Sequence, residues 1–391
     1  MSNIYYVSEG KLYTVQEGSG RLLTSEAAEK YRQNLKEIEK RQEWKTSGAG
    51  ARFMGMGTMS LSAAQSAPEH AYVNVESLTA AGPEKLIYAL SLETSAGLHT
   101  KNPLKEEAAE GFILRRNNTR IHHIDCNSRD GALVASVSDG PKECHIAIIK
   151  EEHSEFHVIT EGETMDITPS YSRANPQVVY YSSAGYYVDP RKNKTYYGSY
   201  CLNRLDLESG SLTEVMADEK YDYIRPKETA AGKLYCIRRP KTAPKERPFL
   251  LDILLIPFRL LKAIFGWLNF FSRRYTGEAL VKDKEGGSNP AKHQMKSEEE
   301  IFIEGNLINA EKALKENIRQ GEKYPGIAPK SWELVLIGES GSIEIIKKGV
   351  LDYAFDGEDL LFSNGKYLIH RRGREEEVIC QAKVAASIVI G

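Results

Sequence analysis

The sequence predicts an all-β protein that is built from repeated four-stranded units. Short apolar runs alternate with turns that contain Gly or Pro along most of the 391 residues, which is the spacing typical of antiparallel strands. The pattern of residues 4–13 also returns at residues 359–368: an apolar strand, a Ser-x-Gly-Lys turn and a second apolar strand. A small sheet cannot bury both of its faces alone, so we expect these units to stack against one another.

The balance of charges gives no general attraction to nucleic acid. Lys and Arg number 52 and Asp and Glu number 54, for a net charge of −2, so we expect no nucleic-acid partner. The five cysteines include no C-x-x-C pair, and four of them fall in strand-like apolar runs, which is typical of reduced thiols in a cytosolic protein. The N-terminus enters a strand without a basic and apolar leader. We therefore expect a cytoplasmic location, or a peripheral one at the inner face of the membrane.

The N-terminal segment predicts three strands followed by a helix. Apolar runs at residues 4–7, 11–15 and 21–24 are separated by turns that contain Gly. Residues 25–46 are expected to form a helical insertion, because Ser25 can cap its first turn and a narrow apolar stripe follows. Its mostly charged surface predicts a helix on the outside of the protein.

Two further units are expected between this helix and the best-defined unit of the chain. Each contains apolar runs of strand length, bounded by turn residues. The predicted strands lie at residues 52–54, 72–78, 86–92 and 112–115, and then, from residue 121 on, at 133–137, 145–149 and 156–159.

The best-defined unit runs from residue 166 to residue 217. It reads Asp166-Ile167-Thr168-Pro169-Ser170-Tyr171-Ser172, a turn, the apolar run 178–181 and a hairpin that contains Leu205-Asp206-Leu207 and Gly210. These residues resemble a blade of the TolB-like, WD40-like (PD40-type) β-propeller family, whose pattern is Asp-x-x-Pro-x-aromatic-Ser, a strand, and a Leu-Asp-Leu-x-x-Gly hairpin. The resemblance implies a propeller fold and no particular chemistry.

One blade is expected to be assembled from both ends of the chain. Residues 384–390 predict a single strand and residues 4–24 supply three, so that together they complete a four-stranded blade and close the ring. We therefore predict one domain over residues 1–391, a six-bladed β-propeller with helical insertions, with seven blades as the alternative. The fourth unit would comprise residues 223–237 and 332–346, and the fifth residues 351–380.

A long insertion, residues 240–330, interrupts the fourth blade. Polar or small residues recur at helical spacing through residues 248–272, which predicts an amphipathic helix with a thin polar stripe. Residues 281–300 are polar and contain Gly and Pro, as in a flexible tether.

The apolar helix of this insertion is expected to lie on a surface rather than to cross a bilayer. About 20 apolar residues would suffice for a crossing, but the strands on either side of the insertion must pair in one blade, so both ends lie on the same side of any membrane. Asp252, Arg259 and Lys262 would also each cost about 2.5–3.5 kcal/mol at the bilayer centre. The helix would dock on a membrane, on a protein partner, on a second copy of the chain, or on the propeller itself. The expected docking residues are Leu254, Leu255, Phe258, Arg259, Leu261, Lys262, Phe265, Trp267, Leu268, Arg273 and Arg274.

A second candidate contact surface is rich in tyrosine. Exposed Tyr beside Arg is typical of interface hot spots, which predicts a partner-binding loop in this part of the chain. The alternative is that about half of these tyrosines fill β-sheet positions. The loop residues are Tyr186, Tyr187, Arg191, Tyr196 and Tyr197.

The sequence gives no indication of catalysis, metal binding or a cofactor. His153 and His157 are four apart, a spacing that separates side chains by roughly 13 Å along a strand, too far to share an ion. The sequence contains no H-E-x-x-H, G-x-S-x-G or Walker pattern. We therefore predict a non-catalytic interaction scaffold, with a small-ligand sensor or an enzyme that uses the central channel as the alternative. The sequence does not identify the residues that line such a channel.

Overall fold

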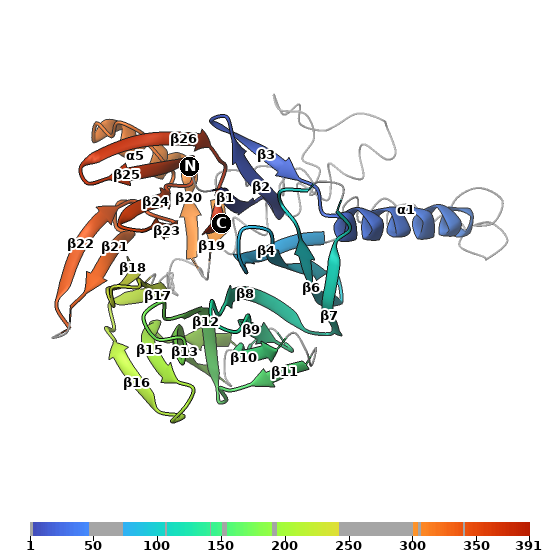
Figure 1. Cartoon of the computed structure of the whole chain (residues 1–391), viewed down its shortest axis with the longest axis horizontal. Coiled ribbons are helices and arrows are strands. Elements are labelled where there is room, and N and C mark those ends of the chain that lie inside the picture. Colours follow the sequence, from blue (N-terminus) through green and yellow to red (C-terminus); the bar gives the residue numbers. More distant parts are fainter. Residues whose placement is uncertain are drawn as a thin grey trace, which may run out of the picture. The chain divides into compact units, whose positions relative to one another are not determined.

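Six antiparallel sheets, arranged as a ring, make up the larger of the two units into which the chain divides (Figure 1). This unit comprises Met1–Lys241 and Lys312–Gly391, and the smaller unit comprises Thr242–Glu311. The sheets are the blades of a six-bladed β-propeller, which confirms the predicted fold and excludes the seven-bladed alternative. The computed structural model describes residues 3–46, 73–105, 108–140, 142–150, 155–189, 194–241, 300–303, 306–338 and 341–391.

The first three blades follow one another along the chain. Blade 1 contains β4 (Val73–Ala80), β5 (Leu86–Leu92), β6 (Ser95–Lys101) and β7 (Gly111–Asn117). Blade 2 contains β8 (Arg120–Cys126), β9 (Leu133–Ser138), β10 (His145–Lys150) and β11 (Glu155–Val158). Blade 3 contains β12 (Thr164–Tyr171), β13 (Val178–Asp189), β15 (Cys201–Asp206) and β16 (Leu212–Met216), and β14 (Lys194–Tyr197) pairs with β13.

The remaining blades use segments that are distant in the sequence. Blade 4 contains β17 (Tyr221–Glu228), β18 (Leu234–Pro240), β21 (Glu333–Ile337) and β22 (Ile343–Lys348). Blade 5 contains β23 (Asp352–Asp356), β24 (Asp359–Ser363), β25 (Tyr367–Arg372) and β26 (Glu375–Gln381). Blade 6 contains β27 (Ala386–Ile390), β1 (Ile4–Ser8), β2 (Lys11–Gln16) and β3 (Ser19–Leu23).

The two ends of the chain meet in blade 6. β27 lies antiparallel to β1, with Ile4 opposite Ile390 and Tyr5 opposite Val389. The C-terminal strand is thus the innermost of this blade and the three N-terminal strands follow it outward. Blade 4 is also discontinuous, because Leu234 of β18 pairs with Ile337 of β21.

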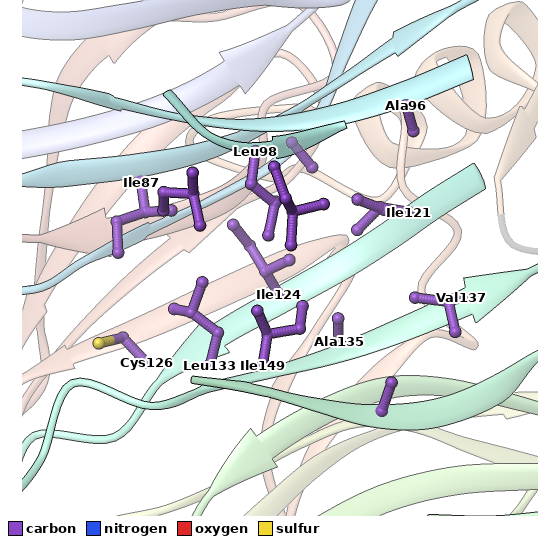
Figure 2. Packing of buried hydrophobic residues seen from close by; sticks show 14 residues of the cluster. Ile87, Ala96, Leu98, Ile121, Ile124, Cys126, Leu133, Ala135, Val137 and Ile149 are labelled. Atoms are coloured by element: carbon purple, nitrogen blue, oxygen red, sulfur yellow. The ribbon is translucent and has the colours of Figure 1, made fainter. Parts of the chain in front are cut away.

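Within the described ranges, hydrophobic clusters join five of the six pairs of neighbouring blades. Ile87 and Leu98 of blade 1 pack with Ile121, Leu133 and Ile149 of blade 2 (Figure 2). Each of these side chains is almost fully buried and contributes about 1.5–3 kcal/mol through the transfer of apolar surface from water. Further clusters connect blades 6 and 1, 5 and 6, 3 and 4, and 2 and 3. Buried strand residues therefore stabilise the ring, because they pack against the buried residues of the next blade.

The helix α1 (Glu26–Thr46) begins at a well-formed cap and extends away from the ring (Figure 1). Ser25 Oγ accepts a hydrogen bond from the backbone N–H of Ala28 at 3.1 Å. The carboxylate of Glu110, from the edge of blade 1, accepts from the N–H of Ala27 at 3.0 Å. These acceptors satisfy donors that the first turn of a helix leaves open.

The smaller unit contains a two-stranded hairpin in its described part. β19 (Glu300–Ile303) pairs with β20 (Asn306–Asn309), and α5 (Ala310–Arg319) follows directly. None of the helices in the part of the chain that the structure describes has the length and hydrophobicity needed to cross a bilayer. The strand predicted at residues 52–54 lies outside the described residues.

Candidate functional site

The innermost strands of all six blades surround one cavity. It is lined by residues of β4, β8, β12, β17, β23 and β27, and its volume is about 490 Å³. This volume falls within the range typical of small-molecule sites. The cavity is the central channel of the propeller, and the residues in it come from positions between 77 and 390 of the sequence.

A continuous belt of hydrogen bonds runs around this channel from one inner strand to the next. In each link, a side-chain group of one blade bonds to the backbone or the side chain of its neighbour, so that the polar groups of the channel wall also hold the blades in register. The links are Ile124 N to Ser77 Oγ (3.2 Å), Tyr171 N to Asp125 Oδ2 (2.8 Å), Arg225 N to Thr168 Oγ1 (3.1 Å), Tyr353 Oη to Arg225 O (2.8 Å), Ile388 N to Asp352 Oδ2 (2.9 Å) and Ser387 Oγ to Ser77 Oγ (3.3 Å).

Three residues of this belt adopt a backbone conformation that L-residues rarely use. The φ angles of Thr168, Arg225 and Ser387 are 50°, 55° and 49°, and each lies where the register of an inner strand shifts. A positive φ at a β-branched residue such as Thr168 is a genuine outlier. Such strain concentrates at functional sites, and here all three residues line the channel.

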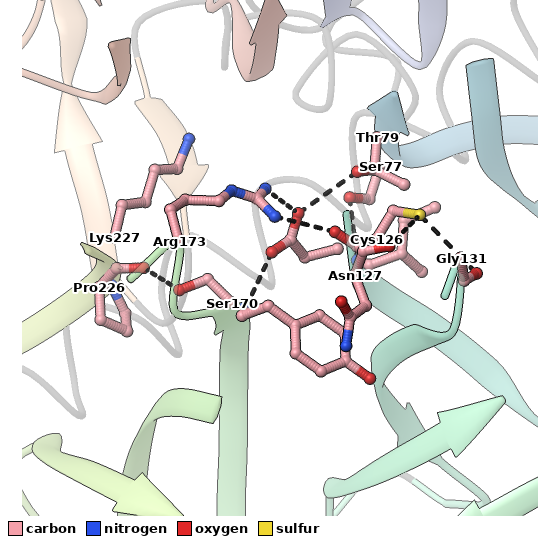
Figure 3. Close-up of polar contacts among 12 residues, drawn as sticks. Ser77, Thr79, Cys126, Asn127, Gly131, Ser170, Arg173, Pro226 and Lys227 are labelled. Atoms are coloured by element: carbon pink, nitrogen blue, oxygen red, sulfur yellow. Dashed lines mark hydrogen bonds and ion pairs between the residues drawn. The ribbon is translucent and has the colours of Figure 1, made fainter. Parts of the chain in front are cut away.

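Asp125, at the end of β8, is the centre of the first charged group in the channel. Arg173 donates from Nη2 to Asp125 Oδ1 at 2.8 Å and from Nη1 to the carbonyl of Cys126 at 2.9 Å (Figure 3). Thr79 Oγ1 also donates to Asp125 Oδ1, at 3.3 Å. The carboxylate of Asp125 raises the pKa of the Arg173 guanidinium, and burial acts in the opposite direction. Arg173 therefore stays charged.

Asp352, at the start of β23, is the centre of the second charged group. Arg225 Nη1 lies 3.1 Å and Lys227 Nζ 3.9 Å from Asp352 Oδ1. Lys227 Nζ also donates to the carbonyl of Tyr353 at 2.5 Å. Loss of hydration lowers the pKa of Lys227, and Arg225 and Arg173 lower it further, while Asp352 and Asp125 raise it. The two charged groups are therefore close enough to act on one another.

The predicted tyrosine-rich loop is a β-hairpin, which corrects the prediction that it is a loop. β13 continues beyond the four-stranded part of blade 3 and pairs there with β14, so that Tyr186 lies opposite Tyr197 and Tyr187 opposite Tyr196. The rings of Tyr187 and Tyr196 stack with centroids 5.2 Å apart and planes 15° from parallel. Tyr residues fit a pleated strand and stabilise it through cross-strand pairs, which is why these residues extend the sheet.

The hairpin brings four of the five predicted residues of this surface together. Tyr187 is 62% and Tyr197 39% exposed, and Tyr186 Oη donates to Glu143 Oε1 at 2.6 Å. Arg191, the fifth, lies outside the described residues. The docking residues predicted in the insertion, from Leu254 to Arg274, also lie outside the described residues.

Sequence reasoning missed the residues of the channel. Asp125, Arg173, Arg225, Lys227 and Asp352 meet only when the ring closes. A signal for one of them, Arg225, was present, because Arg225-Pro226 in β17 occupies the place that corresponds to Thr168-Pro169 in β12. Among the described residues, no cluster of three or more His, Cys, Asp or Glu side chains has the arrangement of a metal site.

Comparison with known proteins relates this chain to others through its fold. No protein-family model matches the sequence. No curated protein matches it either. TolB from Acinetobacter baumannii has a similar structure, with a TM-score of 0.50 and 10% identity over 99% of this chain and 66% of the TolB chain. The fold is a TolB-like six-bladed β-propeller.

Other solved structures are similar to a lesser degree. The putative TolB from Agrobacterium tumefaciens has a TM-score of 0.39 and 14% identity over 63% of this chain and 69% of that one. The tricorn protease has a TM-score of 0.45 and 12% identity over 98% of this chain and 34% of the protease. This chain thus spans 66% of the length of the Acinetobacter TolB and about a third of the protease. At these identities, the TolB-like likeness concerns the fold alone.

Proposed function

We propose that this propeller is a non-catalytic interaction scaffold that binds a protein partner through the hairpin formed by β13 and β14. The observation that carries this proposal is the two cross-strand tyrosine contacts, each with one exposed ring, on a hairpin that extends beyond the four-stranded part of its blade. Tyr is enriched among the residues that dominate binding energy at interfaces. A Tyr side chain also offers a large contact area with only two rotatable bonds, so it loses little entropy on binding.

The hairpin is well prepared for such contacts. The Tyr187 and Tyr196 rings already support one another, and the hydrogen bond to Glu143 holds Tyr186. The segment that connects the two strands contains Arg191 and Lys192 in the sequence. We therefore propose a partner whose contact surface is acidic, and binding that weakens as salt is added.

A binding role, rather than catalysis, also agrees with the use of the acidic residues in the channel. Asp125 accepts hydrogen bonds from a backbone N–H, a hydroxyl and a guanidinium. Asp352 accepts from the backbone N–H groups of Tyr353 and Ile388 and faces two cations. Carboxylates held in this way join strands to one another, and a general base instead needs an oxygen directed at a substrate proton.

The insertion provides a second proposed contact. Its apolar and basic residues between 248 and 274 would place the scaffold on an anionic membrane surface, on a partner, or on a second copy of the chain. The sequence supports this proposal, and it also supports a cytoplasmic location, at the inner face of the membrane if the segment binds lipid.

The hairpin can be tested by site-specific photo-cross-linking. A benzophenone amino acid would replace Tyr187 in one protein and Ile345, an exposed residue of β22, in the control, and adducts formed in extracts of the native cell would be identified by mass spectrometry. We expect a discrete adduct from position 187, competed by unlabelled wild-type protein and not by a Tyr187→Ser/Tyr197→Ser variant. Equal adducts from both positions, or equal competition by both proteins, would exclude the hairpin as the contact.

A further inference from the structure

In the central channel, two basic side chains are more exposed to solvent than the carboxylates with which they pair. The side chain of Arg173 is 42% exposed and that of its partner Asp125 only 14%. The side chain of Lys227 is 32% exposed, while that of Asp352 is fully buried. The cations therefore lie between the carboxylates and the open part of the channel. A molecule that enters the channel meets the positively charged groups first.

Both cations have hydrogen-bonding capacity beyond the contacts that hold them. A guanidinium carries five N–H donors, and the bonds of Arg173 to Asp125 and Cys126 use two of them. An ammonium carries three, and Lys227 directs one at the carbonyl of Tyr353. These hydrogen bonds to the channel wall hold the Arg173 and Lys227 side chains in place, so a ligand that binds them loses little side-chain entropy.

A third carboxylate in the channel, Glu228, is engaged by hydroxyl groups. Tyr180 Oη donates to its Oε1 at 3.0 Å, and Ser172 Oγ donates to its Oε2. Arg173, Arg225 and Lys227 thus face three carboxylates along the cavity wall. This balance leaves no excess of positive charge for a polyphosphate. The two more exposed cations, Arg173 and Lys227, can still bind one negative group together.

The rest of the cavity wall suits an apolar ligand body. Phe355, Val389 and Ile390 line the cavity and are partly exposed, and the ring of Phe355 is held against Tyr235 with centroids 4.5 Å apart. A mostly apolar pocket with a few fixed polar groups is the usual form of a small-molecule site.

We propose that the central channel binds a small organic carboxylate with an apolar body, whose carboxylate is held by Arg173 and Lys227. A planar guanidinium matches the geometry of a carboxylate, and the ammonium supplies a second charge-assisted bond. The volume of about 490 Å³ admits a ligand of this kind. This site is separate from the hairpin proposed to bind a protein, so either proposal can fail without the other.

Aliphatic and aromatic acids serve as probes for this site. Hexanoate and phenylacetate would be compared with hexanamide and phenylacetamide, which have the same shape without the charge, and with inorganic phosphate, by ligand-observed NMR and thermal shift on the full chain. We expect the acids to bind and to raise the melting temperature, and the amides and phosphate to do neither. Equal effects of acid and amide would overturn the proposal, as would phosphate that binds as tightly as the acids.

Two substitutions connect the binding to the named residues. Lys227→Gln should weaken acid binding about ten-fold, the value of one charge-assisted hydrogen bond, while Lys227→Arg should retain most of it. Lys233→Gln, at an exposed lysine of the same blade, is the matched control and should change nothing. Unchanged affinity in Lys227→Gln would overturn the proposal.

The wild-type protein provides a test that requires no variant. Because the pKa of Lys227 is lowered, its ammonium loses its proton at a lower pH than an ordinary lysine does, and acid binding should weaken over that range of rising pH. Affinity that stays constant to well above the ordinary pKa of lysine would exclude the charged Lys227 as a ligand.

Discussion

The carboxylate of Asp352 accepts a hydrogen bond from the backbone N–H of Ile388 at 2.9 Å. This contact ties the inner strand of blade 5 to the strand that closes the ring. The same carboxylate faces Arg225 and Lys227, so one buried group joins blades 4, 5 and 6. Breaking a buried ion pair leaves uncompensated charges in a poorly hydrated site, which is costly.

Replacing this carboxylate should therefore destabilise the protein. Asp352→Asn keeps the size of the side chain but removes the carboxylate that pairs with both Arg225 and Lys227, and we expect the free energy of unfolding to fall by about 3 kcal/mol. Asp359→Asn is the control, since Asp359 pairs with the exposed Arg372 at the surface and should cost about 1 kcal/mol or less. Equal urea midpoints for the two variants would contradict the central role of Asp352.

The ring should depend on its C-terminal strand. Deleting residues 384–391 removes β27 and exposes the edge of β1, which we expect to lower the melting temperature and to promote aggregation. A synthetic peptide with the sequence of residues 384–391 should restore the melting temperature when it is added, because it can occupy the same edge. A truncated protein that remains monomeric with an unchanged melting temperature would contradict this closure.

The cysteines should be almost inert in the folded protein. All five are free thiols, and four are buried. Burial raises the pKa of Cys126 to about 11 and that of Cys144 to about 12, so little of the reactive thiolate forms at neutral pH. We expect a thiol reagent to label few or none in the native state, with the half-buried Cys201 first, and five after unfolding in urea. Rapid native labelling of Cys236 would contradict its burial.

Stability should fall in mild acid because of His122. Burial lowers the pKa of its imidazole from 6.5 to about 4, so between these values the unfolded chain binds a proton that the folded protein does not. Lowering the pH from 6.5 toward 4 therefore favours unfolding, and we expect the free energy of unfolding to fall by about 2 kcal/mol for this partly exposed group. His122→Gln can keep a hydrogen bond to Ser138 and should reduce this loss. Identical pH profiles for the two proteins would exclude His122 as the cause.

The insertion can be tested by changing its apolar surface. Phe258→Asp with Phe265→Asp should abolish sedimentation of the protein with anionic vesicles and leave the propeller folded, because both side chains are expected to enter the acyl region. Leu212→Asp, at an exposed position on β16, is the control and should not change sedimentation. If the wild type ignores vesicles and forms a dimer that the double variant breaks, the contact is with a second copy of the chain.

Much of the fold could be predicted because its information is local. Apolar runs such as residues 133–137 and 178–181 form strand segments in which every side chain is buried, and the turns between strands contain Gly at positive φ, as at Gly210 and Gly365. The closure of the ring could be predicted because one C-terminal strand and three N-terminal strands together make a four-stranded blade. These features need no knowledge of distant contacts.

The candidate sites were less predictable, for two different physical reasons. The channel brings Asp125, Arg173 and Asp352 together from separate blades. No local sequence pattern predicts which charged residues of the different blades will face one another in the channel. The segment predicted as a loop is a hairpin. Its four tyrosines pair across β13 and β14, and this pairing joins residues about ten apart that the sequence does not show as partners.

The pairing of Ile4 with Ile390 has a consequence for how the protein is made. At about 5–20 residues per second, a ribosome needs roughly 20–80 s to travel from one partner to the other. Throughout that time β1 has one unpaired edge, and blade 6 stays incomplete. The strands β1 to β3 must therefore not pair elsewhere until β27 emerges, so we expect a chaperone that binds exposed strand edges to act on this blade during synthesis.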